Sequence, residues 1–172
     1  MSTGGRSTAF GRRTRRLRLL VLLAAAALTW GRSASADESL PAPLAAYAGK
    51  IVVLDFWASW CGPCAQSFPW LNQMQARYGK QLSIVGVDVD AQASDGQAFL
   101  ARHPAQFDVL HDPKGELAER YHIAGMPSTV ILDAAGHVIH QHSGFHATQT
   151  SDYEAALRQA LSLSPIPTGN AP

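Results

Sequence analysis

The sequence predicts an α/β domain with a mixed central sheet and helices on both faces. Two apolar runs rich in β-branched residues, 51–56 and 82–89, are typical of strands that are covered on both sides. Segments with helical spacing of apolar residues alternate with these strands. A predicted hairpin and an amphipathic helix, over 128–142 and 148–163, follow at the end and add antiparallel strands to the sheet.

The predicted elements alternate along the domain. Strands are expected at 51–56, 82–89, 107–110, 128–132 and 137–142, the last two joined by a turn at 134–136. Helices are expected at 40–47, 66–78, 94–102, 115–121 and 148–163. Pro69 should kink the second helix and Gly79 should end it, and Ser94 is a candidate N-cap for the third.

Residues 1–36 are expected to be an export signal. They hold seven arginines and no acidic residue, followed by an apolar run from Leu19 to about Trp30 and the small residues Ala34-Ser35-Ala36 before a cleavage point. The run is shorter than the roughly 20 residues of a membrane-spanning helix, and an uncleaved anchor is the alternative. The domain is therefore assigned to residues 37–163, followed by a disordered tail at 164–172. Its expected location is the bacterial periplasm.

Charge and composition narrow the classes of partner. Hydrophobic residues make up 47% and charged residues 16% of the chain, which is typical of a globular protein. Beyond residue 36 the chain has seven basic and thirteen acidic residues, so the domain is acidic. An acidic domain of this kind does not have the basic surface that is typical of nucleic-acid-binding proteins. Contact with a membrane is expected only if the N-terminal segment is not cleaved.

Cys61 and Cys64 are the two cysteines of the chain, and both follow the strand predicted at 51–56. Export would place them where disulfides persist. A loop of two residues is a poor structural staple, so the pair is a redox centre, half of a metal site, or a chance occurrence. A zinc site needs further ligands that no second cysteine pair supplies. We therefore predict no metal and no cofactor other than the disulfide itself.

A cysteine at the start of a helix has a chemical use. Unpaired backbone N–H groups and the helix dipole favour a negative sulfur there, which lowers the pKa of the thiol. Cys61 would attack a substrate disulfide, and the more buried Cys64 would then resolve the mixed disulfide. The alternative is a pair of inert, buried cysteines.

Two motifs resemble a known family. The segment from Leu54 to Cys64, LDFWASWCGPC, resembles the active site of thioredoxins, and Pro69 matches the proline of their active-site helix. The segment GMPST at 125–129 resembles the loop that carries the family's cis-proline. Residues 85–90 and 107–121 resemble the TlpA/ResA/CcmG branch of extracytoplasmic thiol–disulfide oxidoreductases. The resemblance covers about 40–162 and implies a thioredoxin fold with an inserted strand–helix element.

The resemblance also implies substrate-binding residues. Pro127 would form a cis bond with Met126 and hold the Met126 backbone for pairing with an extended peptide; a trans turn proline is the alternative. Gly62 and Pro63 are the dipeptide of reducing thioredoxins, which favours a reductase. Trp60 is expected to form exposed substrate surface, and a place in the core is the alternative.

Asp55 matches the thioredoxin acid that exchanges a proton with the inner cysteine. Its position in an apolar strand should raise its pKa, and a purely structural or solvated carboxylate is the alternative. Two features depart from the relatives. Gly86 stands where thioredoxins have a lysine near this acid, and Ser67 stands where ResA-like proteins often have a glutamate. Trp57 is expected to pack beneath the active-site loop.

Rival functions remain on the same fold. A copper chaperone would use a wider cysteine spacing, and a peroxidase would need a threonine where this chain has Ala58. A disulfide oxidase or isomerase is separated only by its redox potential. Expected partners, by resemblance, are disulfide-bearing exported proteins, including those of cytochrome c maturation, and a membrane thiol-electron donor. A solvated edge is expected for four histidines near the hairpin, His137, His140, His142 and His146.

Overall fold

The computed structural model describes residues 40–163, all within one compact unit, Glu38–Pro172. The expectations for residues 1–36 and 164–172 lie outside the described part of the chain. Within residues 40–163, none of the helices combines the length and the apolar character that crossing a membrane requires.

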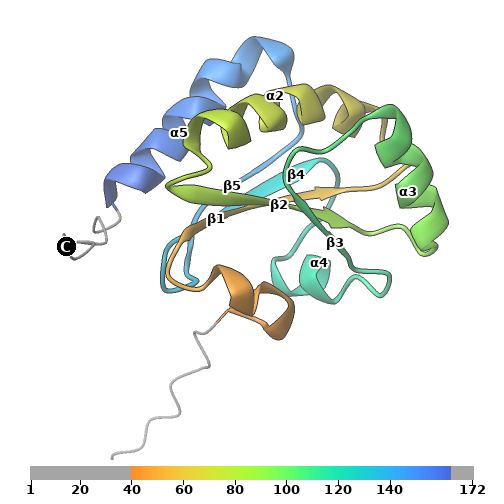
Figure 1. Cartoon of the computed structure of the whole chain (residues 1–172), viewed down its shortest axis with the longest axis horizontal. Coiled ribbons are helices and arrows are strands. Elements are labelled where there is room, and N and C mark those ends of the chain that lie inside the picture. Colours follow the sequence, from red (N-terminus) through yellow and green to blue (C-terminus); the bar gives the residue numbers. More distant parts are fainter. Residues whose placement is uncertain (1–39, 164–172) are drawn as a thin grey trace, which may run out of the picture. The chain divides into compact units, whose positions relative to one another are not determined.

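A mixed sheet of five strands forms the centre of the domain, in the order β3-β2-β1-β4-β5 (Figure 1). The strands are β1 (Ile51–Trp57), β2 (Leu82–Asp88), β3 (Asp108–His111), β4 (Ser128–Leu132) and β5 (Val138–Ser143). β1, β2 and β3 are parallel, whereas β4 and β5 run antiparallel to their neighbours. The predicted mixed sheet is confirmed, and β3 occupies one edge.

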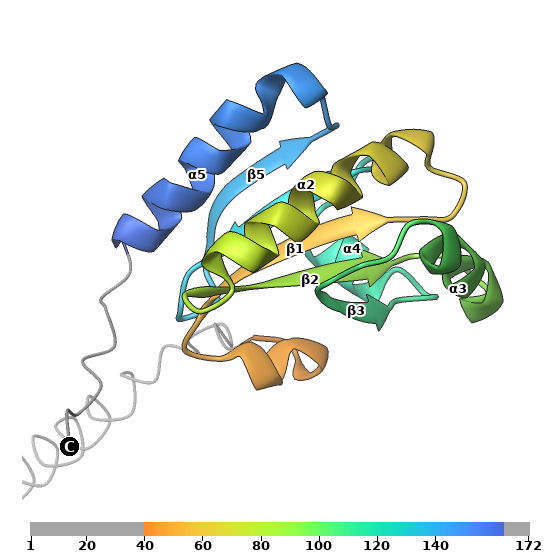
Figure 2. The same cartoon turned by 45° about the horizontal axis from the view of Figure 1, so that its top comes forward.

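Helices cover both faces of this sheet, as predicted. The helical segments are η1 (Ala42–Tyr47), α2 (Gly62–Tyr78), α3 (Ala93–Arg102), α4 (Glu116–Arg120), η2 (Ala147–Gln149) and α5 (Thr150–Leu163). Figures 1 and 2 show α2 and α5 on one face and η1 with α4 on the other. Long apolar strands therefore lie between two helical layers, which explains why no polar face is visible in their sequences.

Two apolar cores result, one on each side of β1, whose seven residues are all buried. Successive side chains of a strand point to opposite faces, so β1 contributes to both cores. The core under α2 and α5 includes Ile51, Val53, Trp57, Phe68, Leu71, Met74, Phe99 and Leu157. The core under η1 and α4 includes Leu44, Val52, Leu54, Phe56, Val87, Leu117, Tyr121 and Val130.

The helix after the cysteines begins at Gly62, four residues before the predicted start at Gln66. Pro63 lies in its first turn, where the missing N–H of proline costs no hydrogen bond, so the Cys-Gly-Pro-Cys segment itself enters the helix. Pro69 lies inside α2, and the helix continues through it. Gly79 follows the last helical residue, as predicted, with an ordinary right-handed backbone.

The predicted N-cap of α3 is wrong. α3 begins at Ala93, with Gln92 at the N-cap position and no capping hydrogen bond from a side chain. Ser94 therefore lies in the first turn, because the extended backbone of Gln92 already supplies the entry to the helix. At the other end of the domain, a short 3₁₀ turn precedes α5, which buries Leu157 and Ala160.

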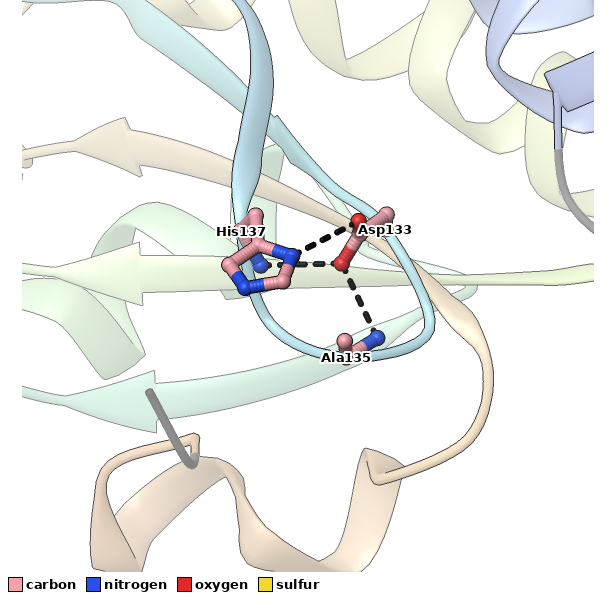
Figure 3. A network of polar contacts seen from close by, with 3 residues as sticks. All are labelled: Asp133, Ala135 and His137. Atoms are coloured by element: carbon pink, nitrogen blue, oxygen red, sulfur yellow. Dashed lines mark hydrogen bonds and ion pairs between the residues drawn. The ribbon is translucent and has the colours of Figure 1, made fainter. Parts of the chain in front are cut away.

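The turn between β4 and β5 is organised by Asp133 (Figure 3). Its Oδ1 accepts hydrogen bonds from the N–H groups of Ala135 and His137, both at 2.9 Å, and its Oδ2 lies 3.0 Å from Nδ1 of His137. Partial burial alone would raise the pKa of Asp133, but the hydrogen bonds from His137 and Ala135 lower it. Gly136 adopts a φ of 95°, a conformation suited to glycine.

Candidate active site

The two cysteines are joined as a disulfide, with an S–S distance of 2.03 Å. Cys61 is the N-cap of α2, and Cys64 lies in the first turn, where its N–H donates to the Cys61 carbonyl oxygen at 3.1 Å. Cys61 keeps 5% of its surface exposed, and Cys64 keeps none. Cys61 is therefore the more accessible of the two sulfurs, and the predicted order of attack stays a prediction.

The loop from β1 to α2 is held by one buried tryptophan and presents another. Trp57 is fully buried and packs against Phe68 and Phe99, with ring centroids 5.3 and 4.8 Å apart. The N–H of Cys61 closes the following turn onto the carbonyl oxygen of Ala58 at 3.0 Å. Trp60 is 72% exposed beside Cys61. The expected burial of Trp57 and the expected exposure of Trp60 are confirmed, whereas contact of Trp60 with a substrate stays a prediction.

The bond between Met126 and Pro127 is cis, as predicted. The loop that carries it is fixed on both sides. The hydroxyl of Ser128 donates to the carbonyl oxygen of Gly125, and the N–H of Gly144 donates to that of Pro127, each at 2.7 Å. Met126 packs against the core that contains both cysteines, so this loop and the disulfide belong to one end of the domain.

A pocket of about 270 Å³ lies between the tryptophan loop and the cis-proline loop. It is lined almost entirely by apolar side chains and glycine, namely Trp60, Val89, Ala118, Ile123, Ala124, Gly125 and Met126. Gly62 and Pro63 are exposed on the first turn of α2. The predicted substrate-binding residues are thus gathered at the end of β1, because β4 begins where β1 ends, with Ser128 opposite Phe56.

Asp55 is a buried carboxyl on β1, only 1% exposed. Burial raises its pKa to about 7, although the hydroxyl of Thr129 donates to Oδ1 at 3.1 Å and lowers the pKa in part. Its other oxygen, Oδ2, is buried and has no hydrogen-bond partner among residues 40–163. The raised pKa that the sequence predicts is confirmed, and the group can take up or release a proton near neutral pH.

Gly86 and Ser67, the two positions that differ from the relatives, are both packed in the interior. Gly86 is the register partner of Asp55 on β2, and a Cβ there would lie 3.0 Å from both Phe107 Cε2 and Trp57 Nε1. A lysine therefore has no room beside the acid. Ser67 is buried, and its hydroxyl donates to the Cys64 carbonyl oxygen at 3.0 Å, so a neutral group stands behind the inner cysteine.

Sequence reasoning missed two buried carboxyls at the end of β2. Asp90 accepts two hydrogen bonds from Ser59 in the active-site loop. Burial raises the pKa of its neighbour Asp88 to about 6. Both residues are more than 95% buried, Asp88 at 4% and Asp90 at 3% exposed. The signal in the sequence was the pattern Asp-x-Asp directly after an apolar strand, at the sheet edge where loops meet.

The histidines near the hairpin do not assemble a metal site. His140 and His142 share a strand face, as predicted, with ring centroids 5.6 Å apart. His142 stacks on Tyr153 of α5, with centroids 4.5 Å apart and rings nearly parallel, and burial lowers its pKa to about 4. Among residues 40–163, no group of three or more histidine, cysteine or acidic side chains is placed to hold a metal ion.

Comparison with known proteins agrees with this geometry. A thiol:disulfide interchange protein, the DsbE homolog of Paracoccus denitrificans, is 33% identical over 115 residues, which cover 66% of this chain and 59% of the relative. The thioredoxin-like protein YneN of Bacillus subtilis is 38% identical over 99 residues, covering 56% and 58%. A solved structure from Chlorobium tepidum, assigned as a DsbE-type thiol:disulfide interchange protein, shares 47% identity with a TM-score of 0.66, covering 69% and 84%.

The aligned region is shorter than the curated relatives, since it spans 59% and 58% of the first two. The model of the AhpC/TSA family matches residues 33–141, more than half of the chain, from before η1 into β5. The chain therefore belongs to the AhpC/TSA family and has the thioredoxin-like fold of its DsbE and ResA relatives.

Proposed function

We propose that this protein is a thiol–disulfide oxidoreductase that reduces disulfides in exported proteins. The observation that carries the proposal is the Cys61–Cys64 disulfide at the N-terminus of α2, next to the cis Met126–Pro127 loop and the pocket beside Trp60. The names of the relatives, thiol:disulfide interchange protein and thiol-disulfide oxidoreductase, support the same activity.

The reaction transfers two electrons from the cysteine pair to the substrate. In the reduced protein, the Cys61 thiolate attacks one sulfur of a substrate disulfide, and the other substrate sulfur leaves as a thiolate that takes up a proton. Cys64 then loses its proton and attacks the Cys61 sulfur. This second step forms the disulfide seen in the structure and releases the remaining substrate thiol.

The two cysteines have different roles because their positions and electrostatic surroundings differ. Cys61 faces the first-turn N–H groups of α2, which stabilise its thiolate. Cys64 is fully buried, and a buried thiol needs a base to ionise it. We assign this role to Asp55, which belongs to the strand before the cysteines and has a pKa of about 7.

Substrate binding is assigned to the surface around Cys61. An extended peptide would pair with the backbone of Met126, and an apolar side chain of the peptide would enter the pocket that Met126 shares with Trp60. Gly62 and Pro63 present no charged side chain to the approaching substrate. Their presence between the cysteines favours the reducing direction.

Location and partners follow from the order of segments in the sequence. We propose that residues 1–36 direct export or anchor the chain, that 37–163 form the thioredoxin-like domain and that 164–172 form a tail. The domain would act outside the cytoplasm, in a bacterial periplasm. A membrane thiol-electron donor would then have to reduce the disulfide again, because exported proteins are cut off from cytoplasmic reductants.

The equilibrium redox potential of the Cys61–Cys64 pair tests the direction of the reaction. We expect a value near that of thioredoxin, about −270 mV, measured against glutathione or dithiothreitol buffers. A value near −120 mV would identify an oxidant and contradict the reductase assignment. Tight copper binding by the reduced protein, without any disulfide exchange, would instead support a copper chaperone.

Trapping identifies the substrates. In Cys64→Ser the second step is blocked, so we expect mixed disulfides between Cys61 and exported proteins, released by dithiothreitol and identified by mass spectrometry. The matched control is Cys61→Ser, which removes the attacking sulfur and should trap almost nothing. Equal trapping by both variants would contradict the assigned order of attack.

A further inference from the structure

We propose that Asp90 is a positioning residue for the active-site loop and that its carboxylate opposes ionisation of Cys61, which strengthens the protein as a reductant. The inference deepens the proposed function and rests on it. It concerns a residue that follows β2 and lies thirty-one positions along the chain from Ser59, in the loop that it holds. Nothing in the Cys-Gly-Pro-Cys motif itself points to this residue.

The first observation is a double hydrogen bond to the loop. Asp90 follows β2 and is 3% exposed. Its Oδ2 accepts the N–H of Ser59 at 2.7 Å, and its Oδ1 accepts the hydroxyl of the same serine at 2.9 Å. Ser59 lies two residues before Cys61, inside the turn that the Cys61 N–H closes onto Ala58. One side chain therefore fixes both the backbone and the side chain of this turn.

The second observation is that Asp90 and its neighbour Asp88 are both held in place by surrounding residues. Its N–H donates to Oδ1 of Asp88 at 2.9 Å, and its carbonyl oxygen lies 2.7 Å from Nε2 of His111 at the end of β3. The N–H of Asp112 donates to the carbonyl oxygen of Asp88 at 2.7 Å. The Asp88 carboxyl also packs against Gly96 of α3, where a Cβ would collide with it. The Asp90 side chain, which is the anchor of the active-site loop, is therefore itself fixed by the residues around it.

The third observation is the charge near the anchor. The titratable groups around Asp90 are Asp88, His111 and Asp112, and within residues 40–163 neither Asp88 nor Asp90 forms a salt bridge with lysine or arginine. The donors on the Asp90 side chain, from Ser59, are neutral. The charge is thus hydrogen-bonded, and no lysine or arginine among residues 40–163 neutralises it.

The distance to Cys61 is short enough for this charge to act on its thiol. Ser59 and Cys61 are two residues apart, which spans at most about 7 Å of chain. With the 2.7 Å hydrogen bond to Ser59, this span puts the separation between the Asp90 carboxylate and the sulfur on the order of 10 Å. At an effective dielectric constant of about 20, a unit charge at that distance changes an ionisation constant by about tenfold. A negative charge disfavours the thiolate, in opposition to the N-terminus of α2.

A less stable thiolate has a redox consequence. The reduced state of the protein contains the ionisable thiol, whereas the oxidised state contains none. Any group that destabilises the thiolate destabilises the reduced state, so the protein gives up its electrons more readily. Asp90 would in this way hold the loop in place and bias the cysteine pair towards reduction of its substrates.

Asp90→Asn tests the charge, because asparagine can keep both hydrogen bonds to Ser59. In a Cys64→Ser background, the ultraviolet absorbance of the thiolate reports the pKa of Cys61 alone. We expect Asp90→Asn to lower this pKa by about 1, which is about tenfold more thiolate at a pH below the pKa. In the protein with both cysteines, the equilibrium constant for oxidation by glutathione should fall by about the same factor at a pH above the pKa of Cys61, where the reduced protein carries the thiolate.

Two controls separate charge from position. Ser59→Ala removes one hydrogen bond but leaves the charge, so it should leave the pKa of Cys61 unchanged. Asp112→Asn removes a buried carboxylate that bonds only backbone N–H groups of α4, and it should lower stability without a comparable change at Cys61. An equal fall in Ser59→Ala and Asp90→Asn would overturn the role of the charge.

A further variant covers a failure of Asp90→Asn to fold. Asp88→Asn removes the neighbouring charge while an amide oxygen can still accept the Asp90 N–H. It should lower the pKa of Cys61 in the same direction by a smaller factor. No change in Cys61 in the folded variants would overturn the inference, whereas a wild-type protein without disulfide exchange would overturn the proposed function.

Discussion

Asp55 is a carboxyl that is almost completely removed from water. It is buried on both sides in an apolar strand, and only Thr129 donates to it. A carboxyl with a pKa of about 7 is half protonated at neutral pH, which suits a group that must take a proton in one direction of a reversible reaction and return it in the other.

We expect Asp55→Asn to slow resolution of the mixed disulfide by about 10–100-fold at pH 7, since Cys64 then lacks its base. The first attack by Cys61 should keep its rate. Stopped-flow measurement with a fluorescent peptide disulfide separates these two steps. Asp152→Asn, an exposed acid of α5, is the matched control. Equal lifetimes of the mixed disulfide in wild type and Asp55→Asn would assign Asp55 a structural role instead.

Residues with local signals could be predicted from the sequence, and residues that depend on tertiary pairing could not. Cys61, Pro127 and Trp60 stand in short motifs whose geometry is largely set by their neighbours. Asp90 acquires its partner only when the end of β2 comes beside the loop after β1. Its pattern, an acid after a strand, is also typical of a solvated loop, so the sequence alone favours no partner for it.

At the scale of single elements, the packing of β2 depends on a glycine. Gly86 lets Trp57 and Phe107 approach the strand, and a Cβ there would lie 3.0 Å from each. We therefore expect Gly86→Ala to lower the free energy of unfolding by about 1–3 kcal/mol through overpacking. Urea denaturation of the oxidised protein measures the loss.

Gly62→Ala is the matched control for this change, because a Cβ at that position would meet nothing within 4 Å except its chain neighbours and the backbone of its own helix. It should leave the stability nearly unchanged, since alanine also favours a helix more than glycine does. If Gly86→Ala proves as stable as Gly62→Ala, the strand has room for a side chain. The absent lysine partner of Asp55 would then not be a consequence of packing.

The β4–β5 hairpin depends on Asp133, which fixes its turn through Ala135 and His137. Its side chain is 31% exposed, so the ion pair with His137 contributes little and the two backbone hydrogen bonds contribute most. We expect Asp133→Ala to lower the free energy of unfolding by about 1–2 kcal/mol at pH 6.

Two further measurements check the cause. The lowered pKa of Asp133 means that its contribution is present above the ordinary carboxyl pKa and is lost as the pH falls below it. The loss in Asp133→Ala should therefore shrink towards pH 3. Asp133→Asn keeps an acceptor and should lose less than the alanine variant; an equal loss in both would show that the backbone hydrogen bonds are not the cause.

The boundaries of elements were harder to predict than the elements themselves. All five strands and their order along the chain follow from apolar runs and turn signals. The start of α2 at Gly62 does not, since glycine and proline are poor helix formers in general. Their tolerance in a first turn depends on the position that β1 and the packing of Phe68 impose, which no local pattern records.

For the whole domain, the alternation of strands and helices is enough to predict layers on both faces, because parallel neighbours require crossovers. The order β3-β2-β1-β4-β5 is a different kind of fact. It depends on which apolar faces fit together, and the family motifs, not the periodicity, implied it. The burial of the titratable groups Asp55 and His142 follows from this order, since both residues lie in strands that helices cover.

These buried groups set opposing pH dependences. The pKa of Asp55 is raised to about 7 and that of Asp88 to about 6, so each contributes stability that is present below its ordinary value near 3.8 and lost as the pH rises. The pKa of His142 is lowered from 6.5 to about 4, so its contribution is present above pH 6.5 and lost as the pH falls. Between pH 4 and 6, the stability lost from Asp55 and Asp88 as the pH rises exceeds the stability gained from His142.

The oxidised protein should therefore be more stable at about pH 5 than at about pH 8, by roughly 2 kcal/mol, with each unit of pH per unbalanced proton worth about 1.4 kcal/mol. Urea denaturation at a series of pH values measures this slope. Asp55→Asn removes the largest falling contribution and leaves Asp88 and His142 nearly balanced, so its profile should be almost flat. His142→Phe removes the opposing contribution and should steepen the fall. A wild-type stability that rises from pH 5 to 8 would mean that Asp55 is ionised in the folded protein across this range, and its assignment as the proton acceptor for Cys64 would fail with it.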